Sequence, residues 1–217
     1  MSGLPCLAQL LAKVTNSNAG VVWYTCQFYS LTFLTTYAKV PVNDTYIIIG
    51  TALLLASPFF ILVGYLSDTY GRKPFMLAGL VLPLATWYPI FQAFMKYGYT
   101  QGNYQPVLLS FLVFVQVIFV ALVYGPIAAF LVELFPTSIR YTSMSLPYHI
   151  GNGVFGGLVP VIGVSVTKAS GNTFGGLWFP LGVAGFTLIC MIFFTPETYQ
   201  NDLETEVEKD EYEKVQV

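Results

Sequence analysis

The sequence predicts an all-α polytopic membrane protein, and three observations support this prediction. Hydrophobic residues make up 55% of the 217 residues, and the mean hydropathy is +0.66. Charged residues make up only 9%, against roughly a quarter in soluble domains, so they are too few to cover a soluble surface. Six stretches also reach about 20 mostly apolar residues, the length with which a helix crosses a bilayer.

These stretches predict six transmembrane helices. They cover residues 20–38, 46–66, 74–94, 106–134, 141–166 and 174–195. They are continuously apolar, whereas the strands of a membrane barrel alternate in polarity. Backbone polar groups in lipid must be satisfied within the segment, which leaves helices as the solution. The predicted organisation is a cytoplasmic segment at residues 1–19, a six-helix bundle at residues 20–198 and an acidic cytoplasmic tail at residues 199–217.

Six spans place both termini on one side of the membrane, and the basic residues favour the cytoplasm as that side. The basic residues predicted on the side of the termini are Lys13, Arg72, Lys73, Arg140, Lys209 and Lys214, and those on the other side are Lys39, Lys96 and Lys168. We therefore expect a multi-pass protein of the cell membrane with both termini in the cytoplasm.

The composition also disfavours several other classes of protein. The net charge of −2 offers no basic patch for nucleic acid. Cys6, Cys26 and Cys190 form neither a CxxC pair nor a metal-ligand spacing, so no metal site is expected. Neither paired carboxylates nor a nucleophile with its base is recognisable, which makes an enzyme the least expected class.

The sharpest motif joins the second and third predicted helices and reads GYLSDTYGRKP at residues 64–74. Gly71 suits a turn with unusual backbone angles, and Pro74 suits the first turn of the next helix. The motif resembles the G-x-L-x-D-x-x-G-R-K loop of the major facilitator superfamily, a large family of secondary transporters. It departs from that loop at Thr69, where a basic residue is common.

A second motif, YGPIAAFLVELFPTSIRYTSMSLPYHIGNG, covers residues 124–153. Together with VVWYTCQFY at residues 21–29, it resembles the metabolite:proton symporter branch of that superfamily, which includes proline/betaine, 2-oxoglutarate, citrate and shikimate transporters. The resemblance extends from about residue 20 to residue 198. Family members have twelve helices in two six-helix halves, and this chain matches only the C-terminal half. The resemblance implies two three-helix inverted repeats.

The resemblance also implies a function. Such a transporter carries a small metabolite, such as an organic acid, betaine or a proline-like compound, together with a proton by alternating access. No cofactor is implied, because the proton gradient supplies the energy. The implied partners are the metabolite, the proton, the lipid bilayer and an N-terminal six-helix half or a second copy. The length of 217 residues keeps an alternative open, a non-transporting truncated product or scaffold module that requires a second half.

Charged residues gather at the predicted cytoplasmic helix ends. An ion pair that is present only when this side is closed would bias the two conformations of a transporter. The resemblance implies this gating role for Asp68 and Arg72, within a motif that also holds Gly64, Gly71 and Lys73. Glu133 and Arg140 extend the predicted gate, and Pro196-Glu197-Thr198 resembles a related cytoplasmic motif.

Polar side chains at mid-membrane depth are the candidate substrate contacts, because secondary transporters bind their substrates near the midplane. These residues are Tyr24, Gln27, Gln116, Tyr124, Tyr148, His149 and Asn152. Tyr24 and Gln27 are expected on one helix face. Hydrogen bonding between helices is the alternative role for each residue. His149 is the only histidine, and its side chain suits either proton coupling or a structural role in the core.

Overall fold

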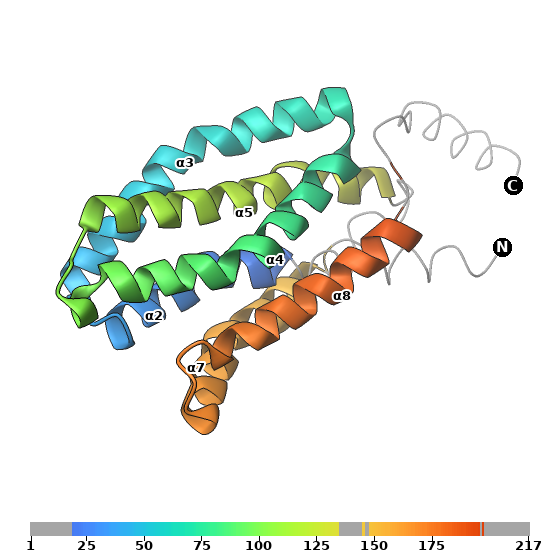
Figure 1. Ribbon diagram of the computed structural model, residues 1–217. Helices are drawn as coiled ribbons and strands as arrows, with labels where there is room; N and C mark the ends of the chain where they lie inside the picture. The colour runs from blue at the N-terminus through green and yellow to red at the C-terminus, as the bar shows by residue number, and fades with distance from the viewer. Residues whose placement is uncertain (1–18, 135–144, 146–147, 196, 198–217) are drawn as a thin grey trace, which may run out of the picture.

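The computed structural model describes residues 19–134, 145, 148–195 and 197, and these residues form an all-helical bundle (Figure 1). The first helix covers residues 19–36 and contains a π-helical segment, η1 (Thr25–Tyr29), followed by α2 (Ser30–Thr36). The next helices are α3 (Val42–Tyr70), α4 (Arg72–Tyr97), α5 (Pro106–Leu134), the fifth helix with η3 (Ile150–Gly156) and α7 (Gly157–Ser170), and α8 (Trp178–Phe194). Short 3-10 turns, η2 (Tyr99–Gln101) and η4 (Gly175–Leu177), precede α5 and α8.

The six predicted helices are therefore present, with shifted ends. α3 begins at Val42 and ends at Tyr70, four residues beyond the apolar stretch on each side. The helix is longer than the apolar stretch because its first and last turns contain polar residues, Asp44 and Asp68. Of the two terminal segments predicted from the sequence, only Ala19 lies among the described residues, so the boundaries of these segments stay a prediction.

Five of the described helices are long and apolar enough to cross a membrane, and the first helix is not among them. The described part of the first helix, residues 19–36, is shorter than the other five and holds several polar side chains. Thr25, Gln27 and Ser30 are all at most 7% exposed, so they do not face lipid. A helix inside a bundle can hold polar residues that a lipid-facing helix would have to avoid.

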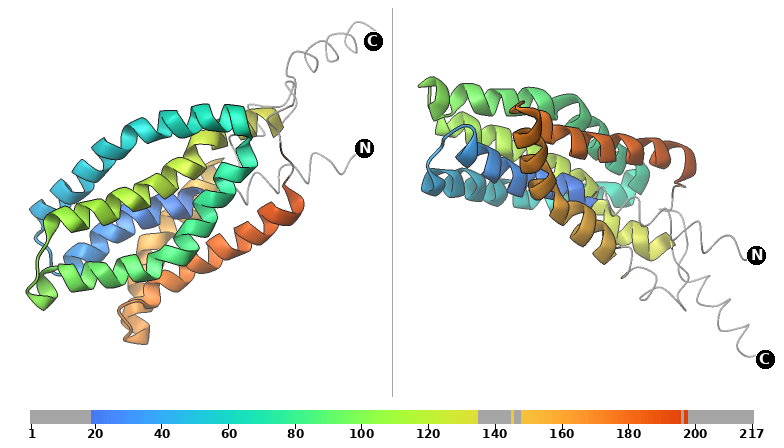
Figure 2. Two further views of the ribbon diagram at one scale, coloured as in Figure 1. Left: turned by 45° about the horizontal axis from the view of Figure 1, so that its top comes forward. Right: turned by 90° about the horizontal axis from the view of Figure 1, so that it is seen from below.

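The bundle is arranged around α5. α5 packs along α3 on one side and α4 on the other, and it also contacts η1 of the first helix (Figure 1). α4 in turn contacts α8, and α7 contacts η1. α7 and α8 lie across the bundle from α3 (Figure 2). This arrangement brings the first helix, α5 and the fifth helix together.

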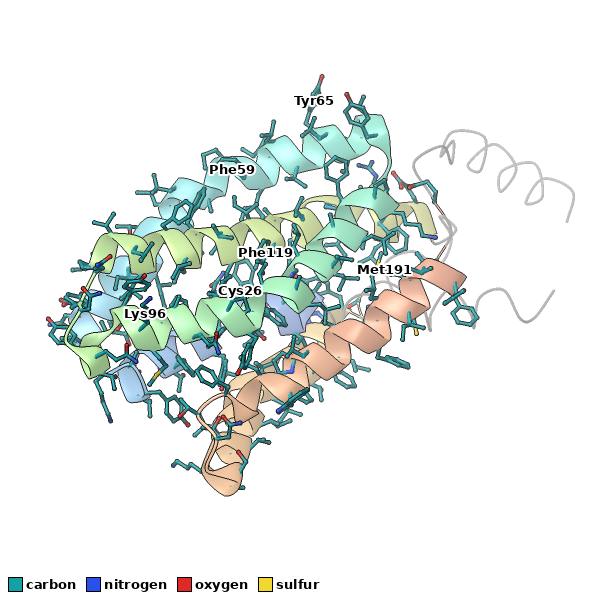
Figure 3. All side chains as sticks on the ribbon, in the orientation of Figure 1. Cys26, Phe59, Tyr65, Lys96, Phe119 and Met191 are labelled. Carbon is teal, nitrogen blue, oxygen red and sulfur yellow. The ribbon has the colours of Figure 1, made fainter. Side chains whose placement is uncertain are left out.

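An aromatic cluster joins the first helix to α4. The rings of Phe33 and Phe91 meet edge to face, with their centroids 4.8 Å apart, and Tyr29 lies 5.5 Å from Phe91. Such pairs contribute about 0.5–1.5 kcal/mol each beyond the area they bury. The outer faces carry large apolar side chains instead, such as Tyr65, which points away from the bundle and is 69% exposed (Figure 3). This distribution suits a bundle surrounded by lipid.

Candidate functional site

The turn between α3 and α4 consists of one residue, Gly71. Its backbone angles are φ +102° and ψ 157°, a conformation that is essentially restricted to glycine. Because α3 ends at Tyr70 and α4 begins at Arg72, this turn places the last turn of one helix beside the first turn of the next. Asp68 and Arg72 thereby come within contact distance across the helix junction.

Arg72 connects three helices through its guanidinium group. Its Nη2 donates to Glu133 Oε1 of α5 at 2.9 Å, and its Nη1 donates to Ser67 Oγ of α3 at 2.9 Å. Nη1 also forms an ion pair with Asp68. Arg72 is only 8% exposed. The planar fork of donors on an arginine suits such a junction, where a lysine could offer only a point charge.

The two acidic partners of Arg72 differ in exposure. The side chain of Asp68 is 58% exposed, whereas that of Glu133 is 11% exposed. An exposed ion pair contributes only about 0–1 kcal/mol. Removing one partner of a buried pair is far more costly, because the other charge stays in a medium of low dielectric constant. The contact with Glu133 is therefore the stronger link between α4 and α5.

Glu197 and Lys73 form a reciprocal connection between α4 and the end of α8. The Glu197 carboxylate accepts hydrogen bonds from the backbone N–H groups of Arg72 (2.8 Å) and Lys73 (3.1 Å) at the start of α4. Lys73 Nζ donates to the Thr195 carbonyl oxygen at 2.6 Å, just past the end of α8. Each charge lies at the helix end whose dipole favours it.

The predicted gate residues and the residues that contact Arg72 do not coincide fully. Gly64 lies where α3 crosses α5, since a Cβ on Gly125 would come 3.2 Å from its nitrogen. Arg140 lies outside the described residues. Ser67 and Glu197 were not predicted as gate residues. The Pro196-Glu197-Thr198 motif signalled the second of these, whereas nothing in the sequence signalled Ser67.

We expect Gly71→Ala to destabilise the protein by about 2–3 kcal/mol, from backbone strain and from displacement of Glu197. A Cβ at this position would lie 2.8 Å from Glu197 Oε2. Gly102→Ala is the control for positive φ. Gly102 lies in the left-handed region (φ +70°, ψ 9°), where alanine costs about 1–2 kcal/mol, and a Cβ there meets nothing within 4 Å. Unfolding in detergent micelles measures both effects. Equal losses from the two variants would contradict a role for Glu197 at the turn.

A second group of residues, all but Trp23 predicted from the sequence, meets between the first helix, α5 and the fifth helix. We call Trp23, Tyr24, Tyr124, Tyr148 and Asn152 the aromatic–amide cluster. The Tyr124 hydroxyl donates to Asn152 Oδ1, and Asn152 Nδ2 donates to the Tyr148 carbonyl oxygen at 3.3 Å. The rings of Trp23 and Tyr124 lie 5.2 Å apart. The cluster presents hydroxyl, amide and aromatic groups together.

Glycines allow the close approach that builds this cluster. A Cβ on Gly20 would lie 2.7 Å from Asn152 Cα, and a Cβ on Gly156 would lie 2.6 Å from the ring of Tyr24. Small residues at helix interfaces let two backbones approach closely. The first and fifth helices therefore pack without a layer of side chains between them at this depth.

Gln27 and Gln116 lie inside the bundle instead, 7% and 0% exposed. Ser30 Oγ lies 3.4 Å from Gln116 Oε1, and the Nε2 groups of both glutamines have no hydrogen-bond partner among the described residues. Tyr24 and Gln27 differ in exposure: Gln27 is buried, whereas Tyr24 is half-buried and stacks on Phe28, which is 48% exposed. The expectation of a shared face assumed α-helical spacing, which the π segment at Thr25–Tyr29 changes.

His149 is exposed in the described structure, and its ring lies 5.8 Å from that of Tyr148. Both alternatives for His149, proton coupling and a structural role, stay predictions. Tyr148 is 39% exposed next to it. Both residues lie at the start of the described part of the fifth helix.

Known proteins resemble this chain over most of its length. An inner membrane metabolite transport protein of Escherichia coli K12, YhjE, is 28% identical over 84% of this chain and 40% of that protein. A citrate-proton symporter of Klebsiella pneumoniae is 27% identical over 79% of this chain and 38% of that protein. An alpha-ketoglutarate permease of Escherichia coli K12 is 26% identical over 78% of this chain and 38% of that protein.

The chain thus spans about 40% of the length of the curated relatives that it matches. No solved structure matches it at a significant level. The sequence profile of the Major Facilitator Superfamily matches residues 14–214, nearly the whole chain. The match agrees with the all-helical bundle and its membrane-length helices, and the chain belongs to the Major Facilitator Superfamily of transporters.

Proposed function

We propose that the chain forms one six-helix half of a secondary transporter that moves a small metabolite together with a proton. The observation that carries this proposal is the aromatic–amide cluster. A hydrogen bond joins Tyr124 of α5 to Asn152 of the fifth helix, and a ring contact joins Trp23 of the first helix to Tyr124. Lipid-facing side chains at this depth would be apolar. In this proposal the cluster lines one wall of the substrate cavity, and a second half or a second copy supplies the opposite wall.

The chemistry of the cluster narrows the substrate class. Tyr124 and Asn152 can hydrogen-bond a carboxylate or a hydroxyl, and the rings of Trp23 and Tyr24 can hold a quaternary ammonium by cation–π contact. No Asp, Glu, Lys or Arg lies in the middle of the described membrane helices. Relatives named for citrate and alpha-ketoglutarate favour an organic acid, with its charge neutralised by the other half.

The Arg72 junction is the proposed cytoplasmic gate. It comprises Asp68, Arg72, Lys73, Glu133 and Glu197, with Gly71 forming the turn. Its contacts hold the ends of α3, α4, α5 and α8 together. Breaking them would free these ends to separate when the cytoplasmic side opens. Gly64 would serve the same gate by allowing α3 to cross α5 closely, and Arg140 remains a proposed member.

A non-transporting membrane module that pairs with a separate half is the second candidate. The chain spans about 40% of the length of the curated relatives that it matches. Uptake by proteoliposomes that hold this chain alone would exclude the module. Uptake that appears only after a six-helix N-terminal half is added would support the half-transporter.

We expect proteoliposomes of the complete transporter to take up an organic acid faster with an inward proton gradient than without one. Tyr124→Phe is expected to raise KM about tenfold, the effect of losing one hydrogen bond to a charged group. Tyr65→Phe, on the outer face of α3, is the matched control and is expected to leave KM unchanged. Equal uptake with and without the gradient would refute proton coupling, and equal KM values would remove Tyr124 from the cavity.

A further inference from the structure

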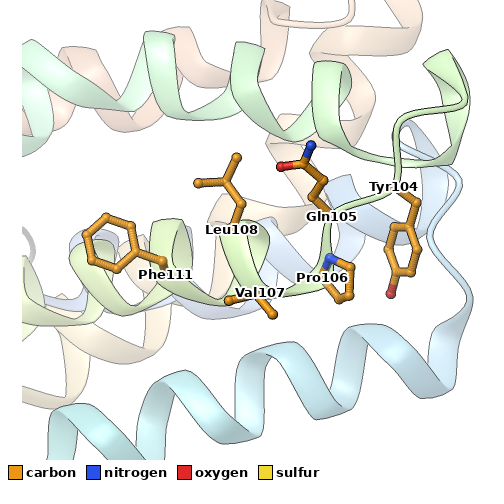
Figure 4. A pocket seen from close by; sticks show the side chains of 6 residues that line it. All are labelled: Tyr104, Gln105, Pro106, Val107, Leu108 and Phe111. Atoms are coloured by element: carbon orange, nitrogen blue, oxygen red, sulfur yellow. The ribbon is translucent and has the colours of Figure 1, made fainter.

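A groove separate from the proposed cavity lies where α3 and α5 meet the loop before α5. Three adjoining hollows of about 620, 420 and 360 Å³ all include Val107 in their walls. We call them together the α3–α5 groove. Its walls include Asp44, Leu55 and Phe59 of α3. They also include Tyr104 of the loop before α5, and Val107 and Phe111 at the start of α5 (Figure 4).

The groove opens away from the aromatic–amide cluster. The six side chains drawn in Figure 4 lie on α5 and the loop before it, between α3 and α4. The first helix meets a different face of α3. Trp23 contacts Phe60, the residue after Phe59 of the groove, and consecutive residues of an α-helix point about 100° apart. Val107 and Tyr124 are also about 25 Å apart along α5. The groove therefore faces the surroundings of the bundle and not the proposed cavity.

The groove is amphipathic along its length. Asp44 and Tyr104 lie at the helix ends, whereas Leu55, Phe59 and Phe111 wall the deeper part. From Asp44 to Phe59, α3 rises about 22 Å, more than the ~15 Å hydrocarbon depth of one leaflet. Polar groups at the membrane surface and apolar walls below match the profile of a lipid molecule.

The polar end of the groove is negative. Asp44 is the single acidic residue at this end among the described residues, and none of their cationic side chains pairs with it. Tyr104 donates a hydrogen bond to Asp44 Oδ2 at 2.9 Å and stacks on Tyr99, with centroids 4.3 Å apart. Burial, and next the hydrogen bond to Asp44, raise the pKa of Tyr104 to about 12, so it stays a donor at neutral pH. The carboxylate and two ring faces suit an ammonium group.

We propose that the α3–α5 groove binds one phospholipid with an ammonium headgroup. The ammonium lies beside Asp44 and the stacked tyrosines, and an acyl chain lies between Phe59 and Phe111. Charge complementarity selects this occupant. Phosphatidylglycerol carries the same phosphate but has no ammonium group to offset the charge of the Asp44 carboxylate. In the proposed orientation of the transporter, the lipid belongs to the outer leaflet.

Native mass spectrometry of the purified, delipidated full chain tests this proposal. Phosphatidylethanolamine and phosphatidylglycerol with identical acyl chains are added at equal concentration. We expect the chain to retain one phosphatidylethanolamine molecule, with about tenfold preference over phosphatidylglycerol. Asp44→Asn is expected to remove this preference, because the variant loses one charge-assisted contact. Equal retention of both lipids by the unaltered chain, or an unchanged preference in Asp44→Asn, overturns the proposal.

Two variants separate the groove from the remaining lipid-facing surface. Val107→Trp fills the groove, and Leu54→Trp adds the same side chain on another face of α3. Val107 and Leu54 are 82% and 74% exposed, so both variants are expected to fold. We expect only Val107→Trp to lose the retained lipid, and equal loss in both overturns the proposal. Phosphoethanolamine without acyl chains should not compete. In the complete transporter, a photoactivatable phosphatidylethanolamine should cross-link to residues 107–114. The absence of a cross-link there, which would result if another protein segment covered the groove, also overturns the proposal.

Discussion

Arg72→Ala is expected to lower the free energy of unfolding by about 3 kcal/mol, the range measured when one partner of a buried ion pair is removed. The guanidinium of Arg72 contacts Glu133, Ser67 and Asp68, so its loss weakens the connection of α4 to both α3 and α5. Glu133, at 11% side-chain exposure, would lose this guanidinium as a charged partner in a mostly dehydrated position. Unfolding of the protein in mixed micelles by increasing amounts of sodium dodecyl sulfate measures the change.

Asp68→Asn and Arg72→Lys are the controls for this prediction. Asp68→Asn removes a carboxylate that is 58% exposed and should cost less than about 1 kcal/mol. Arg72→Lys keeps the charge but cannot contact Ser67 and Glu133 with two separate nitrogens, so we expect a loss between those of the other two variants. Similar losses for Arg72→Ala and Asp68→Asn would show that the link to Glu133 contributes little.

The same variants report on gating in the complete transporter. If the Arg72 junction closes the cytoplasmic side, Arg72→Ala shifts the population toward the conformation open to the cytoplasm. A tenfold shift in population requires only about 1.4 kcal/mol, less than the expected loss of stability. Labelling of a cysteine placed in the cavity by a cytoplasmic reagent should therefore become faster in Arg72→Ala. Unchanged labelling, together with the loss of stability, would assign the junction a structural role only.

The sequence predicted the local contacts of the proposed gate and missed part of its long-range contacts. Asp68 and Arg72 lie four residues apart, so a turn at Gly71 is enough to bring them together. The contacts of Arg72 with Glu133 and of its backbone with Glu197 join residues 61 and 125 positions apart. Such contacts depend on how α3, α4, α5 and α8 pack, which the periodicity of a single helix does not reveal.

The candidate cavity shows the same division between local pattern and packing. Polarity at mid-membrane depth singled out Tyr124 and Asn152, and the structure joins them by a hydrogen bond. Polarity alone did not distinguish them from Gln27 and Gln116, which turn into the bundle. The π segment at Thr25–Tyr29 changes the helical phase between Tyr24 and Gln27, and no residue pattern in the sequence predicted it.

Gly163→Ala is expected to destabilise the protein by about 2–3 kcal/mol through overpacking between the first and fifth helices. A Cβ at this position would lie 2.4 Å from Tyr29 Cε2 and 3.1 Å from its Cζ. The ring of Tyr29 is fully buried and packs against Phe33 and Phe91, so it has no space into which to move. The strain must therefore separate α7 from the first helix or shift the aromatic cluster.

Gly157→Ala is the matched control within the same helix, because a Cβ there meets nothing within 4 Å. We expect it to be neutral or to stabilise the protein by up to about 1 kcal/mol, the helix propensity gained over glycine. If Gly163→Ala costs no more than Gly157→Ala, the contact between Tyr29 and α7 is loose, and the two helices can slide during transport. The expected difference would instead mean that they move as one unit. In the proposed transporter, the cavity would then have to open at the Arg72 junction and between the two halves.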